Sequence, residues 1–221
     1  MRTARLLVAT VMVIWSAGCT EVTARALNAQ DPAIVEAQTH FTYKGKRIPP
    51  FFLADFYGGP QADDFWLRPM GGRICAIAVE GLVAEGDGSY AGAKIYEGEF
   101  VSFDVPSHDE DLGPRGAGWF AYRFVGTTPS GITVLEYVGN TGGSGTIPGV
   151  LFVRFAMEWV GVTKEEKRER LVMHFLGEQS WGDRVYRDVR LEGNSLWLGP
   201  TRTDMPYEKE FAEPAQTMQL E

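Results

Sequence analysis

The chain has 221 residues, which is enough for one good-sized domain with its own hydrophobic core. Its formal net charge of -8 argues against nucleic acid as a partner, because phosphate binding needs a basic patch and the sequence shows none. Aromatic residues make up 12% of the chain, with 26 Gly and 12 Pro, a composition that favours strands joined by turns and so an all-β fold.

The first eighteen residues have the pattern of an export signal. Arg2 and Arg5 precede an uncharged apolar run from Leu6 to Gly18. A basic start followed by such a run is typical of a secretory signal peptide, and the run is too short to span a bilayer as a permanent helix. We therefore expect residues 1–18 to direct the chain out of the cytoplasm and to be removed.

The apolar run ends in Ser16-Ala17-Gly18-Cys19, which resembles the lipobox of bacterial lipoproteins. The resemblance covers residues 1–19 alone, and Ser16 stands where Leu is usual. It implies that Cys19 is diacylated, becomes the new N-terminus and attaches the protein to a membrane. Thr20 stands where an Asp would resemble the inner-membrane retention signal, so we expect an outer membrane lipoprotein that faces the periplasm or the cell surface.

A second cleavage site leaves an alternative open. Ala24-Arg25-Ala26 fits the A-x-A rule of ordinary signal cleavage. Cleavage after Ala26 would remove Cys19 and yield a soluble periplasmic or secreted protein without a lipid.

The next segment is expected to lead from the lipid to the folded domain. Residues 19–38 are polar with small side chains and lack a convincing period, which predicts a tether. His40–Tyr43 and Arg47–Ile48 then predict a small hairpin. Pro49-Pro50 before residues 51–57 and Gly58-Gly59 after them predict one short N-terminal helix, because proline favours helix starts and glycine favours helix ends.

Short apolar or alternating runs predict nine or ten sequential strands within residues 39–200. No internal repeat and no linker divides this region, so we predict a single antiparallel β-sandwich or barrel-like domain. A flexible C-terminal tail is expected from residue 201 to residue 221, which is polar and contains two prolines. The strands are expected near residues 74–83, 94–96, 99–105, 119–125, 132–138, 151–159, 170–175, 184–191 and 195–198.

The clearest of these strands covers residues 151–159. Side chains of a strand alternate between its two faces, and one face here is entirely apolar. Arg154 and Glu158 fall on the opposite face, with Phe152 and Ala156 between them. We predict that the apolar face is buried as one stripe, which consists of Leu151, Val153, Phe155, Met157 and Trp159.

Two clusters of polar residues resemble ligand sites only weakly. The glycine loop 139–145 lacks both the G-x-G-x-x-G spacing and a following Gly-Lys-Ser/Thr, so we predict a connection between strands. His108-Asp109-Glu110-Asp111 gathers potential metal ligands, but adjacent residues diverge and the calcium-loop spacing is missing. His40, His108 and His174 show no zinc-site spacing. We expect no metal site and no cofactor.

Glu136 breaks the pattern of its own strand. It lies between Val134 and Val138 on one face, opposite Leu135 and Tyr137. If the valine face is inward, Glu136 is a buried carboxylate that needs a partner or a raised pKa. Such a group marks either a functional site or a structural ion pair with an arginine, and it is merely exposed if the other face is inward. Glycosidase-type chemistry would need a second carboxylate, which the sequence does not nominate.

The remaining candidates are aromatic residues and a cysteine. Trp66 and Trp181 lie among polar residues near turns, which makes them candidates for an exposed platform. Cys75 lies in an apolar run, and we expect an inert thiol with no disulfide to Cys19. From these features we expect an exported, membrane-anchored binding module of unknown ligand. The alternative is a periplasmic or surface hydrolase acting on carbohydrate or envelope material, with Glu136 as one of two acid/base groups.

Overall fold

A computed structural model describes residues 31–50, 52–57, 75–85, 95–96, 100–104, 119–140, 145–161, 167–203 and 213–221. Its centre is a seven-stranded antiparallel sheet with the order β3-β9-β8-β7-β6-β5-β4. Within the described residues the sheet is open, because β3 and β4 form its two ends. The strands are β3 (Ala76–Ala78), β4 (Ile95–Tyr96), β5 (Phe100–Asp104), β6 (Trp119–Thr127), β7 (Ile132–Asn140), β8 (Ile147–Gly161) and β9 (Lys167–Ser180).

Smaller strand pairs surround this sheet. The three-stranded sheet has the order β11-β12-β14, and two two-stranded sheets, the hairpin β1-β2 and the pair β10-β13, complete the described strands. All pairings are antiparallel, so the predicted all-β antiparallel fold is confirmed, as a sandwich-like arrangement and not a closed barrel. The bounds are β1 (Thr42–Tyr43), β2 (Lys46–Arg47), β10 (Val185–Tyr186), β11 (Val189–Glu192), β12 (Ser195–Leu198), β13 (Arg202–Thr203) and β14 (Gln216–Gln219).

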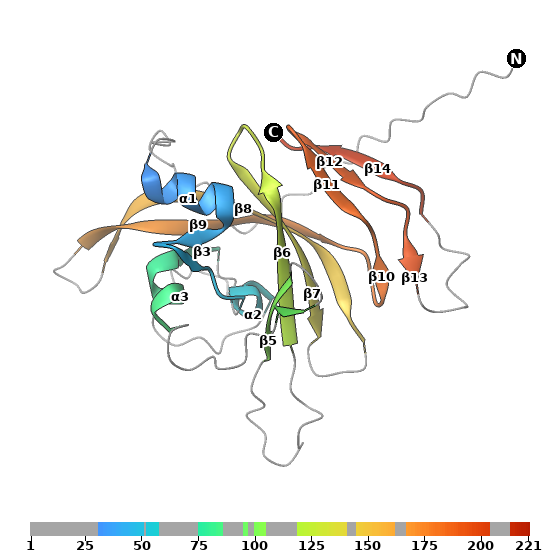
Figure 1. Ribbon diagram of the computed structural model, residues 1–221, viewed down its shortest axis with the longest axis horizontal. Helices are drawn as coiled ribbons and strands as arrows, with labels where there is room; N and C mark the ends of the chain where they lie inside the picture. Colours follow the sequence, from blue (N-terminus) through green and yellow to red (C-terminus); the bar gives the residue numbers. More distant parts are fainter. Residues whose placement is uncertain are drawn as a thin grey trace, which may run out of the picture.

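The central sheet is covered on both faces (Figure 1). Three helices, α1 (Pro32–His40), α2 (Phe52–Tyr57) and α3 (Val79–Glu85), lie on one side of it. The β11-β12-β14 sheet lies on the other side and closes a second apolar cluster. That cluster consists of Ile132, Val134, Val150, Phe152, Val189, Leu196, Leu198, Met218 and Leu220.

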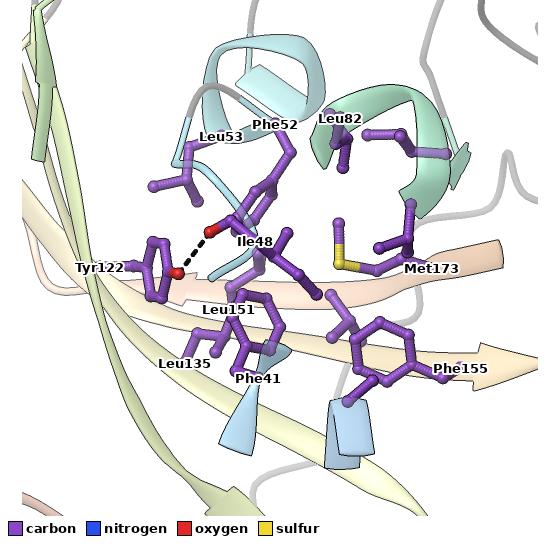
Figure 2. Packing of buried hydrophobic residues seen from close by; sticks show 14 of the residues in the cluster. Phe41, Ile48, Phe52, Leu53, Leu82, Tyr122, Leu135, Leu151, Phe155 and Met173 are labelled. Atoms are coloured by element: carbon purple, nitrogen blue, oxygen red, sulfur yellow. Dashed lines mark hydrogen bonds between the residues drawn. The ribbon is translucent and has the colours of Figure 1, made fainter. Parts of the chain in front are cut away.

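Aromatic rings fill the core on the helix side of the sheet (Figure 2). The Phe41 ring lies 5.1 Å from the Tyr122 ring and 5.9 Å from the Phe155 ring, measured between centroids. Edge-on and tilted contacts of this kind suit the quadrupoles of aromatic rings. The Tyr122 hydroxyl donates a hydrogen bond to the carbonyl oxygen of Ile48, so the buried phenol is not left without a partner.

Residues 32–38, which we expected in the tether, instead form most of helix α1. The Asp31 side chain accepts a hydrogen bond from the Ala33 amide at 2.8 Å, and Pro32 occupies the first turn. Both features stabilise a helix start. The helix buries Ile34 and Ala37 in the core, so the folded domain begins by residue 31 in the described part of the chain.

The short helix predicted at residues 51–57 is present as α2, but the strand predicted at residues 74–83 is only partly correct. The chain forms strand β3 over Ala76–Ala78 and then turns into helix α3. A short, continuous apolar run does not distinguish a buried strand from a buried helix by its period. The described residues therefore contain three helices, where the sequence predicted one.

Strand β8 is buried on two faces, which the alternation alone did not predict. Leu151, Val153 and Phe155 are fully buried on the helix side, as expected. Val150 and Phe152 are buried on the opposite side, under the second sheet.

The prediction that the buried stripe reaches the end of β8 is wrong at Trp159. Met157 is partly buried against the core, whereas Trp159 is 65% exposed. Strands β8 and β9 run past the helices at this end of the sheet (Figure 1). The strand alternation continues to Trp159, but the helices that cover this face of the sheet do not reach it.

The C-terminal residues that the structure describes also differ from the expected free tail. Strand β14 pairs with β12 at the edge of the second sheet. Met218 and Leu220 are buried in the apolar cluster between the two sheets. The amide of Leu220 donates to the carbonyl oxygen of Asn194 at 2.8 Å. The end of the chain is therefore part of the fold.

Candidate functional site

Glu136 is paired with an arginine directly across the central sheet. Arg123 on β6 is the register partner of Glu136 on β7. The Arg123 Nε donates to Glu136 Oε2 at 3.0 Å, and its Nη2 donates to the same oxygen. The Glu136 side chain is 15% exposed and that of Arg123 is 28% exposed. Of the interpretations left open by the sequence, the structure therefore supports a carboxylate on an inward face, held by an ion pair.

A second ion pair lies close enough to influence Glu136. Asp188, between β10 and β11, pairs with Arg202 on β13 at 2.5 Å. Both side chains are exposed, and their charges act on Glu136 in opposite senses. Two arginines and two carboxylates from β6, β7, β13 and the β10–β11 connection thus gather where the second layer meets the central sheet. We call these four residues the charged cluster.

Burial raises the pKa of the Glu136 carboxyl above its usual value. The largest cause is desolvation, which disfavours the charged form. The hydrogen bonds and charge of Arg123 oppose this shift, while the negative charge of Asp188 adds to it. Glu136 therefore gains and loses a proton at a higher pH than an exposed glutamate does.

The charged cluster offers ionic contacts and one carboxylate with a raised pKa. Both hydrogen bonds from Arg123 fall on Oε2, so Oε1 is the oxygen of Glu136 that a further group could approach. Within the described part of the chain, no three His, Cys, Asp or Glu residues come together as metal ligands. The groups that the charged cluster presents are the carboxylates of Glu136 and Asp188 and the guanidinium groups of Arg123 and Arg202.

The other sequence candidates do not join the charged cluster. Trp181 is partly buried against the apolar cluster between the sheets, so its predicted role as an exposed platform is wrong. Its ring instead lies 5.8 Å from the Arg187 guanidinium. Trp66, Cys19 and the segment 108–111 lie outside the described residues.

The glycine loop connects two neighbouring antiparallel strands, as predicted. Its described ends lie in β7 and just before β8. The Thr146 amide donates to Asp183 Oδ1 at 2.8 Å. A side chain added at Gly145 would meet the same carboxylate at 2.7 Å, so the Asp183 side chain would have to shift.

Cys75 is disulfide-bonded, which corrects the expectation of an inert thiol. Its partner lies outside the described residues. Since Cys19 is the only other cysteine in the sequence, a bond within one chain would need the same sulfur as the predicted lipid. A thioether to lipid and a disulfide exclude each other at one sulfur, so the two states can be distinguished by experiment.

None of the helices in the described ranges is long and apolar enough to cross a membrane. No family model, no curated protein and no solved structure matches the chain. The functional argument therefore rests on the residues themselves.

Three members of the charged cluster were missed in the sequence: Arg123, Asp188 and Arg202. They come from separate strands and connections, and no spacing along the chain relates them to Glu136. The one available signal was the hairpin predicted between residues 119–125 and 132–138. Its register, once fixed, places Arg123 opposite Glu136.

Proposed function

We propose that the protein is an exported lipoprotein whose sandwich-like domain acts as a binding module at a membrane surface. The observation that carries the proposal is the N-terminal sequence: Arg2 and Arg5, an uncharged apolar run and then Ser16-Ala17-Gly18-Cys19. Several acyl chains make such an anchor stable, whereas one chain gives only marginal binding. With Thr20 after the cysteine, the expected location is the outer membrane.

The pairing of the polar groups supports binding over catalysis. Glu136 is held by two hydrogen bonds from Arg123, and Asp188 is held by Arg202. A general acid or base must exchange its proton with a substrate, and an ion pair competes with that exchange. Paired charges at the boundary of the two sheets can form part of a contact surface without any proton transfer.

Fractionation of cells that express the full chain tests the anchor. The wild-type protein should sediment with outer membranes, and Cys19→Ser should be released or left unprocessed. Mass spectrometry should find a mature N-terminus at Cys19 with the mass of added acyl chains. An unmodified chain that begins at Leu27 would instead establish ordinary cleavage after Ala26 and a soluble exported protein.

A hydrolase of carbohydrate or envelope material is the second candidate, and one observation favours it. Asp188 is a second carboxylate near Glu136, and its charge helps to raise the pKa of Glu136. A carboxyl with a raised pKa beside an ionised one is the arrangement that acid/base hydrolysis uses. Release of reducing ends from envelope polysaccharide, lost in both Glu136→Gln and Asp188→Asn, would support this candidate. Activity that survives in Glu136→Gln would exclude it.

A further inference from the structure

Arg154 differs from the other arginines of the central sheet, because it has no partner in the described part of the chain. Its Nε is buried and makes no hydrogen bond, and the side chain as a whole is partly exposed. Five other arginines in the described part of the chain are paired with a carboxylate. The ion-paired arginines are Arg123, Arg170, Arg184, Arg187 and Arg202.

Arg154 has a polar neighbour in His174. The two residues are register partners on β8 and β9, so their side chains share the face opposite the helices. His174 Nε2 lies 2.7 Å from Glu158 Oε1, and both of those side chains are largely buried. The interaction fixes the imidazole beside Arg154 and engages the negative charge of Glu158.

Small side chains form the floor between these groups. Ala156 and Val172 face each other across β8 and β9, between the positions of His174 and Glu158. Both are buried, although neither belongs to an apolar cluster. The contact between His174 and Glu158 crosses over Ala156 and Val172. Arg154 lies at one end of this small-residue region, on the same face of β8.

We propose that Arg154, with His174 beside it, is a binding site for a carboxylate group of a small molecule or peptide. A partly buried guanidinium without a counter-ion is costly, and an oxyanion removes that cost by accepting two parallel N–H hydrogen bonds. Glu158 disfavours a doubly charged ligand more than a singly charged one, which favours a carboxylate over a phosphate monoester. The site is separate from the charged cluster and does not depend on the lipid anchor.

The test is a titration of the ¹⁵N-labelled protein with sodium acetate at constant pH and ionic strength. The Arg154 Nε–H signal and the backbone amides of Ala156 and Val172 should shift in a saturable manner. Sodium chloride at the same ionic strength should leave them unchanged. Equal shifts with chloride, or none with acetate, would overturn the site. Tighter binding of inorganic phosphate than of acetate would overturn the assignment to carboxylates.

Variants separate this site from general charge effects. Arg154→Gln should abolish the acetate response, while Arg190→Gln, at an exposed arginine on β11, should retain it. Arg154→Lys keeps the charge but loses the planar pair of donors, so it should bind acetate at least about tenfold more weakly. It also serves as the test if Arg154→Gln does not fold. Unchanged acetate binding in the Arg154 variant that folds would refute the proposal.

Discussion

Arg123 and Glu136 face each other across β6 and β7, and both hydrogen bonds from the guanidinium fall on one carboxylate oxygen, Oε2. The pair lies on the face that the second sheet covers, beside fully buried Val134 and Val150. A carboxylate in this setting depends on its arginine, because water reaches it poorly.

Removal of Arg123 should therefore cost more stability than removal of Glu136. Breaking a fully buried pair costs about 3–5 kcal/mol, and this pair is partly exposed, so we expect about 1–3 kcal/mol for Arg123→Gln at neutral pH. Glu136→Gln should cost less, since it removes the desolvated charge itself. Urea unfolding of both variants and of the double variant measures the coupling. Equal losses for the two single variants would contradict the prediction.

The raised pKa of Glu136 also predicts a pH dependence. A carboxyl whose pKa is higher in the folded state binds protons more tightly there, so its contribution to stability is present below the unfolded pKa. That contribution is lost as the pH rises through the folded pKa. The stability of the wild-type protein relative to Glu136→Gln should therefore fall as the pH rises above the usual pKa of a glutamate.

Asp188→Asn provides the control for this pH dependence. Asp188 helps to raise the pKa of Glu136, so its neutralisation should move the pH transition toward lower pH. Because the side chains of Asp188 and Arg202 are largely exposed, the loss of their ion pair should itself cost only about 0–1 kcal/mol. A transition that stays in place in Asp188→Asn would show that the two carboxylates are not coupled.

The alternation of apolar and polar residues predicted the strands well, but it did not predict which strand faces other elements cover. Period two identified the strands around Glu136 and Phe155, because alternation is a property of the extended chain itself. It could not predict where the covering layers end, which is why Trp159 was assigned to the core. It also could not show that the face carrying Val134 and Glu136 is covered by β11, β12 and β14, because that packing joins segments far apart in the sequence.

The polar sites were predictable only to the extent that one strand pair defines them. Glu136 stood out by interrupting an apolar face, and its partner follows from the register of a hairpin. Arg154 gave no such signal, because an arginine in a strand is expected to face solvent. Its lack of an ion pair becomes visible only when all neighbouring strands are in place.

Phe155 and Trp159 lie on the same side of β8 and should respond very differently to truncation. Phe155 is fully buried among aromatic rings, so Phe155→Ala should lower the free energy of unfolding by about 3–5 kcal/mol. Trp159 is largely exposed, and Trp159→Ala should change it by only about 0.5 kcal/mol. Chemical unfolding compares the two. Similar losses would mean that the apolar layer extends over Trp159 after all.

Arg187 should hold the C-terminal segment in the fold. It is 3% exposed and donates to the carbonyl oxygens of Gly199 at 3.0 Å and Pro214 at 3.2 Å, and it pairs with Glu213. Arg187→Met removes the donors to the buried Gly199 carbonyl and to the exposed Pro214 and Glu213, for which we expect a loss of about 1–3 kcal/mol. Unfolding in urea and digestion with a carboxypeptidase measure the effect.

Glu213→Gln is the matched control for Arg187→Met. Glu213→Gln keeps a side-chain acceptor for Arg187 and leaves the bonds to Gly199 and Pro214 in place, so it should cost less stability than Arg187→Met and leave the C-terminus protected. If instead Arg187→Met leaves residues 213–221 as resistant to carboxypeptidase as the wild-type protein does, the segment is held by its apolar residues alone.

Alkylation of Cys75 tests whether the sulfur of Cys19 carries a lipid or forms a disulfide in the mature protein. Acylation of Cys19 removes the only other cysteine that one chain could offer, so our proposal predicts a free Cys75 thiol after processing. Iodoacetamide added to the denatured, unreduced membrane form should therefore label Cys75, as judged by peptide mass.

The opposite result would follow if the disulfide of Cys75 in the structure forms within one chain, because Cys19 is its only other cysteine. Labelling that requires prior reduction, together with a peptide that joins Cys19 to Cys75, would exclude the lipid and establish the disulfide as the link between the N-terminal segment and strand β3.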